Sequence, residues 1–260
     1  MSMSVESAVP FVVRMTDGNI IKLEYHKSLP SISALARKYA REGYPDRYVV
    51  LAEEKEGTQS SGIYMSLILR PSIFPSQAVF VGPLAAVSAT LALGEHTSKN
   101  IAIGWVSDIF CDGELIGDIS AEGKLDSFTS YEYLIINFSI RLEKDSFPPR
   151  LTDMVRQVFE SENASIPMII AKNILSKFFS LYPFLKSPQK IMSSYDRLFA
   201  LRGEKIKCNI EGSQKTCKVL GVDNATCALV VELRDGRTEK VTTPVGVTVP
   251  KRLKKKTSLT

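Results

Sequence analysis

The chain has 260 residues, of which 44% are hydrophobic and 23% are charged, so it can build its own core without a disulfide or a metal ion. This composition excludes intrinsic disorder over most of the chain. The formal net charge of +5 resides in residues 251–260, because the remainder carries equal numbers of positive and negative side chains. We therefore predict no broad basic face and no nucleic-acid partner, and we interpret the basic tail as a solvated, frayed end.

The four cysteines and two histidines offer no metal-ligand spacing, because no two cysteines form a Cys-x-x-Cys pair. We therefore predict no metal site. The first twenty residues lack an apolar core behind a basic start, and no run approaches the roughly 18 apolar residues of a membrane span. The sequence thus predicts a reduced, cytoplasmic protein that does not bind a membrane.

The spacing of apolar residues predicts alternating strands and helices. Extended pieces around a turn at 16–19 come first, and a helix follows Ser31 and ends near Gly43. Further strands are expected at 48–52, 63–69, 101–105, 108–111, 114–119 and 133–142, and further helices at 80–93, 151–158 and 168–181. Asp112-Gly113 is a strong hairpin signal, because this dipeptide tolerates the positive φ angles of a tight turn.

The last part of the chain differs from the first in having only short, closely spaced β-type segments. Short runs of β-type residues occur at 205–210, 215–220, 228–233 and 239–243, with Gly- and Asn-containing turns between them. About fifty residues with this spacing fit a small SH3-like β-barrel. We therefore predict a first domain over 1–192, an SH3-like domain over 193–250 and a basic tail over 251–260, with the junction at 193–202.

Four strings of the first domain resemble the biotin protein ligases, and the related lipoate protein ligases, in their order and spacing. These strings are Gly62–Pro71, the helix Pro83–Thr90, Ile103–Ile109 and the hairpin that ends at Gly117. The resemblance implies an α/β (α+β) fold, with a mixed β-sheet flanked by helices and followed by the SH3-like barrel. It also implies biotin and MgATP as ligands, if ligase activity is retained, and a biotin carboxyl carrier domain as the acceptor of biotin.

Two of the family's ligand-binding elements are altered. Lys55 stands where a biotin-contacting glutamine is usual, and the loop that follows it up to Ser61 contains no arginine. This loop is a poor phosphate clamp, because anionic oxygens are held by guanidinium groups and backbone N–H groups. Of the family's Lys-Trp-Pro-Asn-Asp string, only Trp105 and Asp108 are kept. Asp108 has two interpretations: a ligand for a metal or a donor, and a structural carboxylate at a strand end.

Two further elements are altered next to the reacting groups. Glu114 occupies the position of the lysine that in the family reaches the reacting carboxylate and phosphate, so repulsion replaces attraction. Lys124 follows ten residues later and does not match this position. The Gly-x-Gly-x-Asn run that admits the nucleotide has become Asn137–Arg141, without either glycine. At the start of the first helix, only the Ser31 hydroxyl remains as a biotin contact.

These changes favour a degenerate homologue, weakly active or inactive, that works as a binding or scaffold protein. The first alternative is an active biotin–protein ligase that uses Lys55, Asp108 and Lys124. The second is a lipoyl- or octanoyl-type acyl transferase with Cys111 as its nucleophile, although a cysteine in a hairpin strand is more typically buried and inert.

The candidate residues follow from these motifs. The candidate catalytic residues are Asp108 and Lys124, and the candidate ligand-binding residues are Ser31, Lys55, Gly62, Tyr64, Trp105 and Gly117. We expect the pocket between the strands 48–52 and 63–69 and the hairpin 105–117. An open pocket in which Lys55 and Asp108 converge would favour the ligase, and a pocket filled by Phe138 or Arg141 would not. No oligomeric state is predicted.

Overall fold

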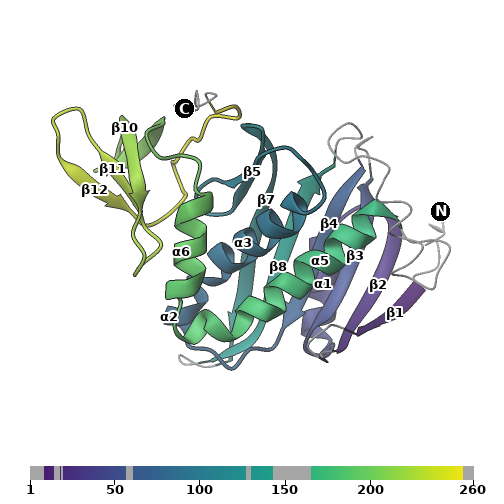
Figure 1. Ribbon diagram of the computed structural model, residues 1–260. Helices are drawn as coiled ribbons and strands as arrows, with labels where there is room; N and C mark the ends of the chain where they lie inside the picture. The colour runs from purple at the N-terminus through teal and green to yellow at the C-terminus, as the bar shows by residue number, and fades with distance from the viewer. Residues whose placement is uncertain are drawn as a thin grey trace.

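The computed structural model describes residues 9–14, 18, 20–56, 61–126, 130–142 and 165–253. Within these residues one sheet has the order β1-β2-β3-β4-β8-β7-β6-β5 (Figure 1). Its strands are β1 Val9–Arg14, β2 Ile20–Leu29, β3 Tyr48–Lys55, β4 Ser61–Leu69, β5 Ile101–Ile103, β6 Asp108–Cys111, β7 Glu114–Leu125 and β8 Tyr131–Arg141. β2 and β3 run parallel and the other neighbours run antiparallel, which confirms the predicted mixed sheet.

Helices flank both faces of this sheet, as predicted (Figure 1). The helices are α1 Ile32–Arg41, α2 Pro75–Ala78, α3 Val81–Gly94, α5 Ile166–Leu181, the 3₁₀ helix η2 Tyr182–Lys186 and α6 Gln189–Leu198. α3 and α5 pack against one face, and α1 packs against the opposite face, on β3, β4 and β8. The predicted helix 151–158 and the predicted turn 16–19 fall outside the fully described part of the chain.

The segment Pro75–Gly94 is long and apolar enough to cross a membrane, judged by length and composition alone. In the fold, however, 67% of the most apolar stretch of this segment is buried, because α3 packs on the sheet beside α5 and is also covered by α6. Packing in the core therefore accounts for its apolar character.

The hairpin between β6 and β7 forms as the sequence predicts. Asp112 and Gly113 both have positive φ angles, 49° and 82°, and their neighbours Cys111 and Glu114 face each other across the turn. Gly and Asp adopt this conformation at low cost, which explains why the dipeptide fixes the turn.

The C-terminal part forms a second sheet of four antiparallel strands in the order β12-β11-β10-β9. Its strands are β9 Lys205–Ile210, β10 Ser213–Val222, β11 Leu229–Glu232 and β12 Thr238–Val241. α6 spans the predicted boundary at residue 192 and packs on α3, so a helix leads into this sheet. The indole Nε1 of Trp105 donates to the Cys227 carbonyl at 2.8 Å and ties the two sheets together.

Residues Gly246–Leu253, which we call the C-terminal strap, connect β9 to the tip of the β6–β7 hairpin. The prediction of a frayed tail is wrong for residues 251–253, because their backbone pairs with the hairpin; residues 254–260 lie outside the described range. The hydrogen bonds that hold the strap are Asn209 N to Gly246 O (3.1 Å), Lys207 N to Thr248 O (3.3 Å), Leu115 N to Lys251 O (2.9 Å) and Leu253 N to Gly113 O (2.8 Å).

Candidate functional site

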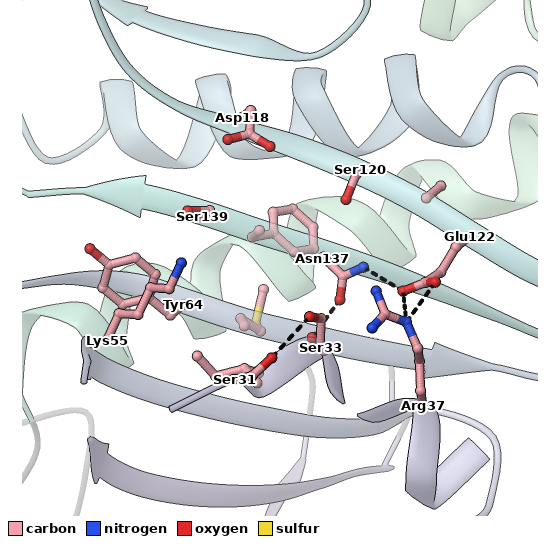
Figure 2. A pocket seen from close by; sticks show the side chains of 15 residues that line it. Ser31, Ser33, Arg37, Lys55, Tyr64, Asp118, Ser120, Glu122, Asn137 and Ser139 are labelled. Carbon is pink, nitrogen blue, oxygen red and sulfur yellow. Dashed lines mark hydrogen bonds and ion pairs between the residues drawn. The ribbon is translucent and has the colours of Figure 1, made fainter. Parts of the chain in front are cut away.

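A polar pocket of about 370 Å³ opens on the α1 side of the large sheet, beside the start of α1 (Figure 2). Its polar lining residues on β4, β7 and β8 stand at every second position, because alternate side chains of a strand point to the same face. Its polar lining residues are Ser31, Ser33, Arg37, Lys55, Tyr64, Ser66, Asp118, Ser120, Glu122, Asn137 and Ser139.

The position of α1 fixes one wall of this pocket. Ala36 and Ala40 are buried against the sheet, and their small side chains let the helix lie close to it. Tyr39 donates a hydrogen bond from its hydroxyl to the buried carboxylate of Glu24 on β2, at 3.1 Å. The helix is thus held by apolar contact and by a charge-assisted hydrogen bond, which is among the stronger kinds.

A chain of hydrogen bonds lies along the pocket, as Figure 2 shows for its labelled members. The Nε of Arg37 contacts both carboxylate oxygens of Glu122, at 2.9 and 2.8 Å. The Asn137 amide nitrogen donates to Glu122 at 3.2 Å, and the Ser66 hydroxyl donates to the Asn137 amide oxygen at 2.6 Å. Because each partner holds the next, these side chains are ordered before any ligand arrives.

Three of the predicted ligand-binding residues line the pocket: Ser31, Lys55 and Tyr64. The Ser31 hydroxyl is engaged as the N-cap of α1, because it accepts a hydrogen bond from the Ala34 N–H at 3.3 Å. Lys55 comes from the end of β3 and Tyr64 from the middle of β4, so the sheet brings together residues that a loop separates in sequence.

The two predicted glycines act through backbone spacing. A Cβ at Gly62 would lie 2.4 Å from the Ile140 carbonyl oxygen, and one at Gly117 would lie 2.2 Å from the Ser139 carbonyl oxygen. Both positions therefore allow β8 to approach its neighbours β4 and β7, and neither glycine is among the residues that line the pocket.

Asp108 and Asp118 lie opposite each other on β6 and β7. Burial raises the pKa of Asp108 to about 6, and the nearby Asp118 carboxylate adds to the rise. Burial also raises the pKa of Asp118, while Lys55 opposes this rise. Asp118 lines the pocket together with Lys55 and Asp108 does not, so the convergence of Lys55 and Asp108 that would have favoured the ligase is not found.

The remaining candidates lie elsewhere. Trp105 is 4% exposed and belongs to the core, and Lys124 forms an ion pair with Glu132 at 2.5 Å on a part of β7 that does not line the pocket. Glu114 pairs with Arg252 of the C-terminal strap at 3.3 Å, and both side chains are more than half exposed. Neither Glu114 nor the buried Cys111 is among the lining residues.

The predicted position of the pocket is close to the observed one but displaced along the sheet. β4 contributes as expected, whereas β7 contributes Asp118, Ser120 and Glu122, which lie beyond the hairpin. Phe138 lines the pocket without filling it, and Arg141 points to the hairpin, where its guanidinium donates to a backbone carbonyl at 2.7 Å.

Sequence reasoning missed the central part of the polar network, Arg37, Glu122 and Asn137. The signal was present in the strands, because a polar residue stands at every second position of 118–122, and again at 137 and 139 in an otherwise apolar strand. Such alternation predicts a polar surface on one face of a sheet.

No protein-family model matches the chain. Over 156 residues, or 55% of the chain, it is 24% identical to the bifunctional ligase/repressor BirA of Bacillus subtilis, and the match covers 48% of that protein. The BirA of Bacillus spizizenii matches with the same identity and coverage. The chain thus spans about half the length of the curated relatives it matches.

Solved structures share the fold over more of the chain. The biotin protein ligase of Aquifex aeolicus superposes with a TM-score of 0.64 at 15% identity, over 87% of this chain and 96% of that one. A biotin protein ligase-like protein of unknown function from Silicibacter sp. gives a TM-score of 0.58 at 16% identity, over 85% of this chain and 94% of that one.

Proposed function

We propose that this chain, which has the fold of the biotin protein ligases and resembles them in sequence, is a degenerate homologue that binds a small ligand in the polar pocket without adenylating biotin. The observation that supports this proposal is the balance of charge in the pocket. Its described lining has two cations and two carboxylates, and Arg37 is already paired with Glu122. Lys55 has the carboxylate of Asp118 within electrostatic reach.

A balanced pocket is poorly suited to a nucleotide triphosphate. Phosphoryl oxygens are stabilised by surplus positive charge from Arg, Lys or a metal ion, and a nearby carboxylate repels them strongly where the dielectric constant is low. Glu114, at the position of the family's lysine, adds a further negative charge, and its partner Arg252 offsets it at the hairpin tip. The described residues therefore do not fit MgATP, and we derive no step of an adenylation reaction.

The pocket does fit a small polar ligand. Its hydroxyl groups and its ordered amide offer both donors and acceptors, and an arrangement fixed before binding loses little entropy when a ligand enters. We propose that residues 193–250 form an SH3-like module and that the protein works in the cytoplasm.

One observation favours the alternative of an active ligase with a biotin carboxyl carrier domain as its acceptor. Lys55 lines the same pocket as Ser31 and Tyr64. In an active ligase, its ammonium group would hold the carboxylate of the ligand there. For the acyl-transferase alternative, the described structure offers no comparable support, because Cys111 is 6% exposed and does not line the pocket.

The deciding experiment incubates the protein with biotin, MgATP and a biotin acceptor domain, and then measures the intact mass of the acceptor. An active biotin ligase in a parallel tube serves as the positive control. We expect the acceptor to gain one biotin only in the control tube. A gain with this protein that disappears in the Lys55→Ala variant would refute the proposal and establish the ligase.

Binding is measured separately by isothermal titration calorimetry with biotin as the probe, in the presence and absence of MgATP. We expect MgATP to leave the heat of biotin binding unchanged. The variant Asn137→Leu keeps the size of the side chain and removes its amide, so it should abolish binding in the pocket. Lys38→Met, on the exposed side of α1, is the matched control and should bind as the wild type does.

A further inference from the structure

The positive charge of the protein is concentrated in its C-terminal part. Residues 193–260 contain 14 Lys and Arg against 7 Asp and Glu, whereas residues 1–192 contain 19 against 21. Five of these 14 cations belong to residues 251–260, so residues 193–250 carry nine Lys and Arg against seven Asp and Glu. The arrangement of these cations, rather than their excess, therefore decides what the module attracts.

The C-terminal sheet lies at one end of the molecule (Figure 1), and several of its cations gather on one side of it. Along β9 the buried positions alternate with exposed Lys205 and Lys207. Lys218 on β10 lies directly opposite Lys205 in the register, and Arg234 follows β11. We call Lys205, Lys207, Lys218 and Arg234 the basic face.

Two adjoining grooves of about 300 and 400 Å³ cross the β10–β11 side of this module. Lys205 and Lys218 line the first, Arg237 lines the second, and Arg234 lines both. Leu233 lines both as well, so the grooves combine cations with apolar surface.

The arrangement of the basic face lowers the stability of the fold. Like charges directly opposite each other on neighbouring strands are destabilising, and this is the relation of Lys205 to Lys218. Among the residues that the structure describes, Lys205, Lys207 and Arg234 form no ion pair, and Lys218 reaches Glu232 only at 3.7 Å. Lys205, Lys207 and Arg234 thus hold charge that no ion pair neutralises within the described chain, whereas Arg237 of the second groove pairs with Asp235 at 2.8 Å.

We propose that the basic face binds an acidic segment of a partner protein. Residues 205–241 contain no Phe, Tyr or Trp, so the face offers no ring on which the bases of a single-stranded nucleic acid would stack. Glu232 and Asp235 interrupt the cations along the same grooves, and a phosphate backbone, which carries a charge at every nucleotide, cannot avoid them. A peptide can place spaced carboxylates on the cations and an apolar side chain on Leu233.

The test measures the fluorescence anisotropy of three labelled probes with the full-length chain: an oligoglutamate peptide with interspersed alanine, a DNA duplex and an oligothymidylate. We expect the peptide to bind most tightly and its affinity to fall as salt is added. The variant Lys205→Glu/Lys207→Glu should weaken peptide binding about tenfold. Arg41→Glu/Lys186→Glu changes the net charge equally on the other part of the molecule and should not.

Stability separates loss of binding from loss of fold. Lys205→Glu replaces a repulsive pair with an attractive one opposite Lys218, so the melting temperature of the double variant should not fall. The proposal is overturned if the wild type does not bind the peptide, if the variant at Lys205 and Lys207 binds it equally well, or if either DNA probe binds more tightly than the peptide.

Discussion

Replacing Asp108 by Asn should stabilise the protein at neutral and alkaline pH. Burial raises the pKa of this carboxyl from 3.8 to about 6, so the folded state holds its proton more tightly than the unfolded state does. Stability is therefore greatest when Asp108 is protonated and falls as the pH rises from about 4 to 6. A shift of about two units corresponds to at most about 3 kcal/mol above pH 6, which the neutral Asn side chain avoids.

The assay is urea denaturation of the wild type and of Asp108→Asn at a series of pH values. The variant should unfold with a higher free energy at pH 8, and its advantage should shrink steadily as the pH falls below 6. Asp223→Asn provides a control of opposite sign, because a hydrogen bond from Lys240 lowers the pKa of Asp223 to about 2. This control should lose stability at neutral pH. Equal stability of Asp108→Asn and the wild type at pH 8 would show that the raised pKa is absent.

Three further substitutions test contacts that hold the fold together. Tyr195→Phe removes a buried hydroxyl that donates to two backbone carbonyls at 3.0 and 2.8 Å, and should lower the unfolding free energy by about 1 to 3 kcal/mol in urea. Gly117→Ala places a Cβ against the Ser139 carbonyl and should speed amide hydrogen exchange in β7 and β8, whereas unchanged exchange would contradict the close approach. Trp105→Phe leaves the Cys227 carbonyl unpaired and should lower the melting temperature followed by circular dichroism; an unaltered value would show that this bond does not join the sheets.

Local signals in the sequence predicted most of the fold. The helix after Ser31 begins there because the serine side chain caps it, and the hairpin at Asp112-Gly113 forms because these two residues tolerate positive φ angles. The order of the strands did not follow from such signals. The resemblance to a known family implied a mixed sheet but no order of strands was predicted, since pairing between strands distant in the chain leaves no local trace.

The site was harder to predict, because it depends on which strands are neighbours. Asp118 was overlooked although it lines the pocket, whereas Lys124, on the same strand, lies outside it. Motif positions singled out Lys55 and Tyr64, and both line the pocket. The ion pair between Arg37 and Glu122 joins a helix to a strand that lies 85 residues later, and no spacing in the sequence predicts such a contact.

The C-terminal strap also bears on how the molecule is completed during synthesis. The hairpin tip at Gly113 acquires its hydrogen bond from Leu253 only after residue 253 has been synthesised, 140 positions after Gly113. Domains generally fold from the N-terminal side during translation, so β6 and β7 are made long before this partner is. Within the described residues, the tip of this hairpin is therefore the last part of the large sheet to receive its hydrogen bonds.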